Sequence, residues 1–524
     1  MDNIRSRLEL VLCILLLGLI VAIVLAQANP LYQVPNRDSG FFMYAGSQIL
    51  KGKLLYLDIW DSKGPLIFYI NTIALWIGQG SRWGVWGMEF IFLFLSSFVG
   101  FKIMEKLWGG IPAIFGSILW LFAFNNVVRG GNFTEEYSLL FSFIAIYAFW
   151  LGLEKPENKF YPFIIGATLS INFLFRANNI GVQISIIGVT ILAGIFDKNY
   201  TYFAKRLLWI GLGILSVLTL VALYFLHLGT LDDMIQAAIF YNFYYSHEGT
   251  KLGELFKSFI RGIDLLGLAY LLPTFLGFIL LLEKLPSVVR SNLTSLRDIN
   301  LLLLIGYPVE IILSGLSGNN FPHYYICWSP YIGMLSASLL GLGKIPFKKH
   351  WFAISFMILL FSITNLDILG QYRTAFEKII FNRSSGIELV HPVAKYVRDN
   401  TNPEETVLVW GTQPYINLLA RRDSPTGILF YPQLADTPFT NNLNDKFYQD
   451  LVQNKPVLIV DMVTLNNDSM PFIDPMRRAE QESRLKMFTP PSNLELVFNF
   501  IHQNYHLETI VGGVPIYRIN ENTP

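Results

Sequence analysis

Apolar segments long enough to cross a lipid bilayer recur through the first 370 residues of the chain. Because a spanning helix needs roughly twenty mainly apolar residues, the sequence predicts about eleven spans. They lie near 8–26, 83–101, 109–125, 134–153, 160–175, 180–196, 207–226, 263–282, 299–316, 324–342 and 351–369. With 53% hydrophobic and only 15% charged residues, the chain is too apolar for a soluble globular protein. We therefore expect a mainly α fold, a polytopic transmembrane helical bundle.

Lysine and arginine gather in alternate short loops between the predicted spans. These basic loops are 102–108, 154–159, 197–206, 283–298 and 343–350. Short loops rich in Lys and Arg stay in the cytoplasm, so these loops and the N-terminus are predicted to be cytoplasmic. An odd number of spans then places the residues after 370 outside the cytoplasm, together with 36–66 and 227–262.

The first span admits a second interpretation. It follows Arg5 and Arg7, and Ala26–Ala28 resembles a signal-peptidase site, so a cleaved signal peptide is the alternative. The apolar run is longer than a usual signal core, and many further spans follow it. These two features favour an uncleaved first helix.

The chain changes character near residue 382. Short strand-like runs lie at 406–411, 456–462 and 510–519, and helical patterns lie at 391–400, 414–421, 444–453 and 494–504. Strands that alternate with helices predict a small α/β fold with a largely parallel sheet. We therefore expect a transmembrane domain over 1–370, with an outer loop at 28–82 that carries interfacial helices, and an extracytoplasmic α/β domain over 382–524.

The first outer loop concentrates acidic and aromatic side chains beside the predicted membrane. After Asp38, the residues Phe41, Ala45 and Ile49 recur at helical spacing, and Gly52 follows as a helix stop. Such a short amphipathic helix is expected to lie at the membrane surface. Asp38 is either the N-cap of this helix or a general base held in a fixed position, and the two roles are compatible.

The motif WDSKGPL closes the same loop. Gly64 and Pro65 predict a turn before the next apolar stretch, so Asp61 and Lys63 are expected just above the bilayer. An exposed ion pair of little energetic value is the simple interpretation. The density of polar groups in a loop otherwise built from aromatics favours a functional one.

Two further polar motifs lie at outer ends of predicted spans. RGGNFTEEY contains Arg129, Glu135 and Glu136, although glutamates in a first helical turn are also favoured by the helix dipole. FRANNIG places Arg176 in a very short loop between apolar spans. A cation there is costly unless it is paired, either with a phosphate or with Glu135 or Glu136.

The remaining polar residues give weaker signals. His323 and Tyr324 in NNFPHYYICWSP fit an aromatic belt when taken alone. The two cysteines, Cys13 and Cys327, lie far apart in apolar runs and predict neither a disulfide framework nor a thiolate metal site. The net charge of +1, without a Lys/Arg tract, gives no support for nucleic-acid binding.

These features together resemble the GT-C superfamily of membrane glycosyltransferases. Shared with it are an N-terminal helix, a first outer loop whose acidic residue opens an interfacial helix, a second acidic turn before Gly-Pro, and an outer C-terminal domain. The likeness covers roughly residues 1–370 and is greatest to the branch of protein O-mannosyltransferases and lipid A aminoarabinose transferases. Ser39 and Lys63 depart from the mannosyltransferase pattern, which has a second acidic residue and a His-Pro type pair there.

The resemblance implies transfer of a sugar from a polyprenyl-phosphate donor to a glycan, lipid or protein acceptor at the outer face of a bacterial-type plasma membrane. Asp38 matches the residue regarded as the base in an inverting reaction. The implied substrate-binding residues are Asp61, Lys63, Arg129, Glu135, Glu136, Arg176, His323 and Tyr324. Among them, Arg176 with Lys63 or His323 would bind the carrier phosphate.

No cofactor is implied, and a divalent cation, if one takes part, would bind among Asp38, Asp61, Glu135 and Glu136. The lack of a Gly-rich motif between a strand and a helix fits a lipid-linked donor. A transporter or flippase of a lipid-linked sugar is the alternative of a different class, but transporters show internal repeats and broken helices at midplane depth. An inactive scaffold and a glycan polymerase or ligase also remain open.

Overall fold

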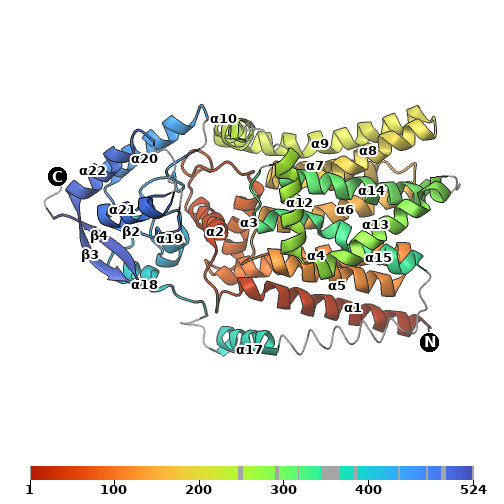
Figure 1. Ribbon diagram of the computed structural model, residues 1–524, viewed down its shortest axis with the longest axis horizontal. Helices are drawn as coiled ribbons and strands as arrows, with labels where there is room; N and C mark the ends of the chain where they lie inside the picture. The colour runs from red at the N-terminus through yellow and green to blue at the C-terminus, as the bar shows by residue number, and fades with distance from the viewer. Residues whose placement is uncertain are drawn as a thin grey trace. The chain divides into compact units, whose positions relative to one another are not determined.

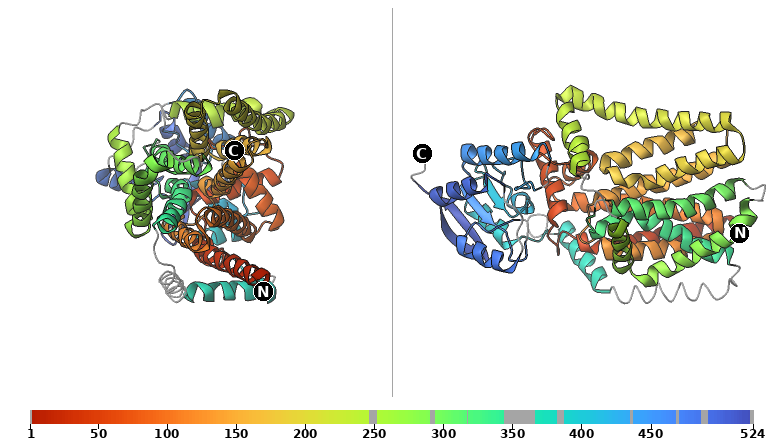
Figure 2. Two further views of the ribbon diagram at one scale, coloured as in Figure 1. Left: turned by 90° about the vertical axis from the view of Figure 1, so that its right-hand side faces the viewer. Right: turned by 45° about the horizontal axis from the view of Figure 1, so that its top comes forward.

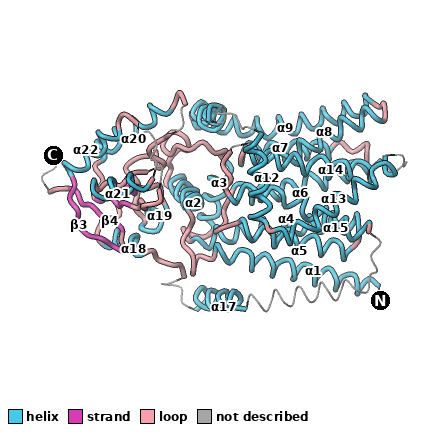
Figure 3. Tube along the Cα trace, in the orientation of Figure 1, coloured by secondary structure: helices cyan, strands magenta, loops and turns pink. Residues whose placement is uncertain are grey.

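The computed structural model describes residues 2–245, 252–289, 294–316, 318–343, 366–381, 387–434, 437–467, 470–485 and 491–521. Helices make up most of these residues, and the strands are confined to the C-terminal part of the chain (Figure 3). The chain forms two compact units. Unit 1 comprises Met1–Asn29, Trp86–Tyr224 and Gly249–Ser385, and unit 2 comprises Pro30–Val85, Phe225–Glu248 and Gly386–Pro524.

Unit 1 consists of long apolar helices that run side by side (Figure 1, Figure 2). In chain order its elements are α1 (Asp2–Val24), η1 (Leu25–Ala28), α4 (Arg82–Trp108), α5 (Gly110–Val127), α6 (Thr134–Glu154), α7 (Phe160–Phe175), η2 (Ala177–Ile180), α8 (Gly181–Phe196), α9 (Tyr200–Leu228), α12 (Leu252–Leu266), α13 (Leu268–Val289), α14 (Thr294–Gly315), η5 (Pro322–Trp328), α15 (Ser329–Leu342) and α17 (Leu366–Phe381). Helix α4 begins, and α9 ends, within the residues of unit 2.

The predicted spans are present as helices wherever the structure describes them. In the described residues, nine helices are long and apolar enough to cross a bilayer. The predicted span at 160–175 forms α7, an apolar helix of 16 residues. Most of the predicted span at 351–369 lies outside the described residues. The expected helical, polytopic fold class is confirmed.

Glycines allow close packing inside unit 1. Helix α5 packs along α15, and a Cβ on Gly116 would lie 2.4 Å from the carbonyl oxygen of Gly333. Helix α13 also packs along α15, where a Cβ on Gly277 would lie 2.0 Å from the carbonyl oxygen of Leu335. Small residues at such contacts let helix backbones approach in a membrane. This packing fixes α15 and therefore η5, which leads directly into it.

Unit 2 combines the first outer loop with the C-terminal α/β region. Its elements are α2 (Arg37–Leu50), α3 (Leu66–Ile77), α10 (Leu231–Ile235), the π-helix η3 (Gln236–Phe240), α11 (Tyr241–Tyr245), α18 (Pro392–Asp399), β1 (Val407–Trp410), α19 (Tyr415–Ala420), α20 (Thr440–Asn454), β2 (Leu458–Asp461), α21 (Pro475–Arg484), α22 (Leu494–Asn504), β3 (Tyr505–Val511) and β4 (Val514–Ile519). The grouping differs from the expected boundaries, which placed the first loop with the transmembrane residues.

The sheet of unit 2 is mixed, with strand order β1-β2-β4-β3. Strands β1 and β2 are parallel, whereas β4 runs antiparallel to both β2 and β3. The prediction of a largely parallel sheet with one strand at 510–519 was therefore wrong. Gly512 and Gly513 adopt φ values of 58° and 85° and turn this stretch into a tight β3–β4 hairpin.

Candidate functional site

Helix α2 carries Asp38 in its first turn. The N-cap is Asn36, whose side-chain oxygen accepts a hydrogen bond from the Ser39 amide at 2.8 Å. The prediction that Asp38 caps this helix was therefore wrong, because Asn is an equally good N-cap and precedes it. Asp38 instead pairs with Arg37, with Nε and Oδ1 3.1 Å apart. Gly52, with φ 89°, follows the helix end as expected.

Helix α2 is buried against two other helices of unit 2. It packs along α3 and against α19, and Phe41, Phe42 and Tyr44 are all nearly inaccessible to solvent. A Cβ on Gly40 would lie only 2.5 Å from the Cβ of Tyr415 in α19. The helix predicted to lie on a membrane surface is therefore covered by the C-terminal region.

Asp61 and Lys63 form a local turn, as the motif WDSKGPL predicted. The Asp61 carboxylate accepts the Lys63 amide at 2.8 Å, and its Oδ1 lies 3.4 Å from the Lys63 ammonium nitrogen. The Asp61 side chain is 4% exposed and that of Lys63 is 31% exposed. The hydroxyl of Tyr56 donates to the Lys63 carbonyl at 2.8 Å. The ion pair is thus anchored on a buried carboxylate rather than on an exposed one.

Two cations of the first loop face the same aromatic ring. The Arg37 guanidinium lies 5.7 Å and the Lys63 ammonium 5.9 Å from the ring centroid of Phe430. Lys63 also lies 5.3 Å from the ring of Phe42. The ring of Phe430 in turn contacts Phe41, with centroids 4.8 Å apart. The sequence analysis did not single out Arg37 or Phe430. Phe430 lies almost four hundred residues after Arg37, in a loop without a motif.

The segment 423–431 of the C-terminal region holds the first loop through polar contacts. Asp423 accepts hydrogen bonds from Gln48 and Lys51, each at 2.6 Å. The Ser424 amide donates to the hydroxyl of Tyr44, and the Gly427 carbonyl accepts the Trp60 amide. The first-loop residues in these bonds all lie between Asp38 and Asp61 in sequence. The bonds fix the loop against the segment.

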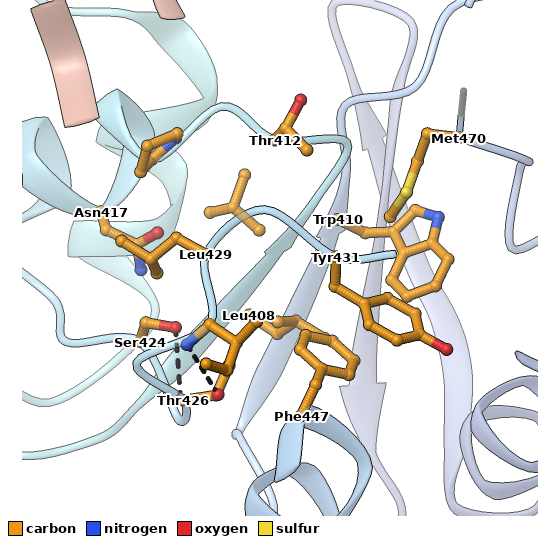
Figure 4. Close-up of a pocket in the computed structure, with 13 residues that line it drawn as sticks. Leu408, Trp410, Thr412, Asn417, Ser424, Thr426, Leu429, Tyr431, Phe447 and Met470 are labelled. Atoms are coloured by element: carbon orange, nitrogen blue, oxygen red, sulfur yellow. Dashed lines mark hydrogen bonds between the residues drawn. The ribbon is translucent and has the colours of Figure 1, made fainter. Parts of the chain in front are cut away.

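The segment 423–431 also lines a small pocket within the C-terminal region (Figure 4). Ser424, Thr426 and Tyr431 contribute to its wall, together with Trp410 of β1. The Thr426 hydroxyl accepts the Ile428 amide at 3.0 Å and stiffens the turn. Trp410 and Tyr431 are 1% and 2% exposed, so their rings belong to the core. Tyr431 therefore anchors the end of the segment in the core of the C-terminal region.

Unit 1 brings three of the predicted motifs together. The Arg176 guanidinium forms an ion pair with the Glu135 carboxylate. It also lies 3.7 Å from the ring centroid of Tyr324, close enough for a strong cation–π contact. The Glu135 side chain is 1% exposed and that of Arg176 is 21% exposed. The ion pair with Glu135, one of the two predicted partners of Arg176, is thus present in the structure.

His323 extends this cluster through stacked rings. Its imidazole lies parallel to the ring of Phe133 at 4.2 Å and to that of Phe321 at 5.9 Å. Tyr324 meets His323 edge to face at 4.8 Å. The polar groups of three separate elements, α6, the α7–α8 turn and η5, therefore lie beside aromatic faces.

The loop before α6 adopts an uncommon backbone conformation. Arg129, Gly130, Gly131 and Asn132 have φ values of 35°, 94°, 70° and 62°. The Asn132 amide donates to the Glu136 carboxylate at 2.9 Å. A left-handed conformation is costly for residues that carry a Cβ, here Arg129 and Asn132, and is kept where the surroundings fix it.

Side chains of α4 and α6 supply these surroundings. The Tyr137 hydroxyl donates to Asn132 Oδ1 at 3.0 Å. A Cβ on Gly131 would lie 2.1 Å from Oε1 of Glu89, a buried residue that the sequence interpretation passed over. Glu136 is fully buried and holds the loop, whereas Arg129 is exposed at its tip.

The predicted site residues thus fall into two groups. Asp38, Asp61 and Lys63 lie in unit 2. The predicted residues in unit 1 are Arg129, Glu135, Glu136, Arg176, His323 and Tyr324. Within the part of the chain that the structure describes, no three His, Cys, Asp or Glu side chains gather as metal ligands would.

A match to a protein-family profile over the first part of the chain identifies the family. The profile described as "Putative competence-induced protein Ccs4 N-terminal domain" matches residues 2–325, more than half of the chain. The chain belongs to this family. No curated protein matches the sequence of this chain closely enough to count as a relative.

Two solved structures of ArnT share its fold at low sequence identity. ArnT from Cupriavidus metallidurans bound to undecaprenyl phosphate is 10% identical over 97% of this chain and 98% of ArnT, with a TM-score of 0.55. The apo state of ArnT is 12% identical over 98% of both chains, with a TM-score of 0.53. The archaeal oligosaccharyltransferase AglB from Archaeoglobus fulgidus is 12% identical over 87% of this chain and 69% of its own, with a TM-score of 0.46.

The likeness to ArnT extends over both compact units of the Ccs4 family member. It confirms the GT-C fold that the sequence resembled, and it also covers the C-terminal region, which the resemblance had left unassigned. With its many apolar helices, the chain is an integral membrane protein.

Proposed function

We propose that the chain is an inverting glycosyltransferase that moves a sugar from a polyprenyl-phosphate donor to a glycan, lipid or protein acceptor. The observation that carries the proposal is the whole-length fold likeness to ArnT, whose structure holds undecaprenyl phosphate. The GT-C resemblance also supports the proposal, because it selected charged residues of the first loop and of unit 1 as site residues. The basic short loops further support a cytoplasmic N-terminus and an extracytoplasmic C-terminal region.

The proposed chemistry needs a base for the acceptor and cations for the leaving phosphate. The acceptor oxygen or nitrogen attacks the anomeric carbon and forms the new bond as the bond to the phosphate oxygen breaks. The acceptor proton passes to the Asp38 carboxylate, and the electron pair leaves on the phosphate. Positive charge placed where this negative charge develops lowers the barrier.

Arg176, with Lys63 or His323, is proposed to bind the phosphate. Asp61 is buried and holds both the amide and the ammonium group of Lys63, so its proposed role is to orient that cation. Arg176 would exchange part of its pairing with Glu135 for the phosphate. The Tyr324 ring faces the Arg176 guanidinium and the His323 ring packs on Tyr324, and both are proposed to contact the sugar.

The purified full-length protein tests the base directly. Lipid-linked sugars and cell-envelope acceptors extracted from membranes are supplied, and the release of free polyprenyl phosphate is followed by mass spectrometry. Because a general base contributes about 10²–10⁴-fold, Asp38→Asn should lower the release at least about a hundredfold. Binding of undecaprenyl phosphate, measured in parallel, should not weaken, since Asn preserves the size of the side chain and removes a negative charge beside Arg37.

Asp58→Asn is the matched control in the same loop. Asp58 is exposed, and its carboxylate accepts the Leu54 amide at 2.8 Å, a bond that Asn can also accept. This variant should retain activity. Full activity of Asp38→Asn would sink the proposed role of Asp38.

A further inference from the structure

The C-terminal region contributes an aromatic side chain to the charged part of the first loop. Phe430 is the residue of segment 423–431 whose ring faces both Arg37 and Lys63, at 5.7 and 5.9 Å. Each cation also has an acidic neighbour, Asp38 for Arg37 and Asp61 for Lys63. Two cation–carboxylate pairs therefore meet at one aromatic ring.

An aromatic ring and a carboxylate hold a cation in different ways. A carboxylate neutralises the charge, whereas a ring attracts it through its quadrupole and adds no net charge. A cation held by a ring therefore keeps its full charge for an arriving anion. An incoming phosphate can replace the carboxylate partners while the contacts to Phe430 persist.

The ring itself is firmly placed. Phe430 packs on Phe41 of α2, with centroids 4.8 Å apart. Asp423 and Ser424 bind α2 from the same segment, and Gly427 binds Trp60. A residue anchored in this way can keep two long, flexible cations near one position. This reduces the entropy that Arg37 and Lys63 lose when a ligand binds.

We propose that Phe430 is a positioning residue that holds Arg37 and Lys63 for the phosphate of a polyprenyl-phosphate ligand. The C-terminal α/β region is then part of the phosphate site and not an accessory domain. This inference rests on the proposed function and extends it to the region that the sequence motifs left without a role.

The test measures binding of undecaprenyl phosphate to the full-length protein in detergent micelles. In Phe430→Leu the ligand must order two long side chains that the ring holds in the unchanged protein, so binding should weaken about tenfold. Phe430→Trp retains an electron-rich ring and should bind within about threefold of the unchanged protein. Phe500→Leu removes a half-buried ring on α22, for which the structure gives no cation contact, and should bind normally.

Each outcome decides the matter. Unchanged binding by Phe430→Leu overturns the inference, and so does an equal loss in Phe430→Trp, because the ring would then act by shape alone. Thermal unfolding of the three variants shows whether any loss reflects unfolding. If the unchanged protein does not bind undecaprenyl phosphate, the proposed function falls together with the inference. If Lys63→Gln weakens binding while Phe430→Leu does not, only the inference falls.

Discussion

At the scale of single residues, Arg176 is held by two partners of different chemistry. Glu135 supplies a buried opposite charge, and Tyr324 supplies an aromatic face at 3.7 Å. Removal of one member of a buried ion pair leaves an uncompensated charge, which costs more than the pair contributes. Arg176 is thus a structural residue even before a phosphate reaches it.

We expect Arg176→Gln to lower the free energy of unfolding by about 3 kcal/mol, because the Glu135 carboxylate loses its cation. The double variant Glu135→Gln with Arg176→Gln should recover most of this loss. Arg261→Gln is the control, since Arg261 and Asp264 form an exposed pair that contributes at most about 1 kcal/mol. Thermal unfolding in detergent measures all three, and a double variant no more stable than Arg176→Gln would contradict the account.

Asp461 gives the C-terminal region a pH dependence. It ends β2, its carboxylate accepts the Val463 and Ile473 amides, and burial raises its pKa from 3.8 to about 7. Between about pH 4 and pH 7, the native state keeps a proton that the unfolded state has lost. Rising pH therefore favours unfolding in this window.

The difference in stability between the unchanged protein and Asp461→Asn isolates this effect. The amide does not titrate, so the unchanged protein should lose stability relative to the variant as the pH rises from about 4 to about 7. Thermal unfolding at several pH values measures the difference. A difference that stays constant or grows with pH in favour of the unchanged protein would refute the assignment.

At the scale of elements, the contact between α2 and α19 places Asp38. Gly40 lies so close to Tyr415 that no side chain fits without a shift of α2. We expect Gly40→Ala to cost about 1–3 kcal/mol, as overpacked sites do. Gly87 in α4 has open space around its Cα, and Gly87→Ala should be neutral or stabilising by up to about 1 kcal/mol. Equal effects of the two variants on thermal unfolding would argue against a tight contact.

Element prediction succeeded where one local signal dominated. The helices near 391–400, 414–421, 444–453 and 494–504 were predicted from periodicity and are present as α18, α19, α20 and α22. The hairpin at 510–519 was missed, because its apolar pattern continues through a Gly-Gly turn that was assigned to the strand. Helix α21 was missed too, although Asp474 and Pro475 at its start are a normal N-cap and first residue.

At the scale of the whole molecule, the order of motifs was sufficient to predict the GT-C fold. Apolar length and basic loops are read from short windows, so the sequence alone carries them. The partners of individual side chains depend on tertiary contacts. Phe430 and Glu89 have no local signature in the sequence. The structure identifies them, because the Phe430 ring lies beside Lys63 and a Cβ on Gly131 would meet the Glu89 carboxylate. The roles of the predicted site residues in catalysis stay predictions.

The central claim is that this chain transfers a lipid-linked sugar and that Asp38 is its base. Mass spectrometry of cell-envelope glycans tests it most directly, in a strain that lacks the gene and in the same strain supplied with either the unchanged gene or Asp38→Asn. We expect a glycan to lose the mass of one sugar without the gene, to regain it with the unchanged gene, and to remain without it with Asp38→Asn at equal protein level. Restoration of that mass by Asp38→Asn, or identical glycans with and without the gene, would contradict the claim.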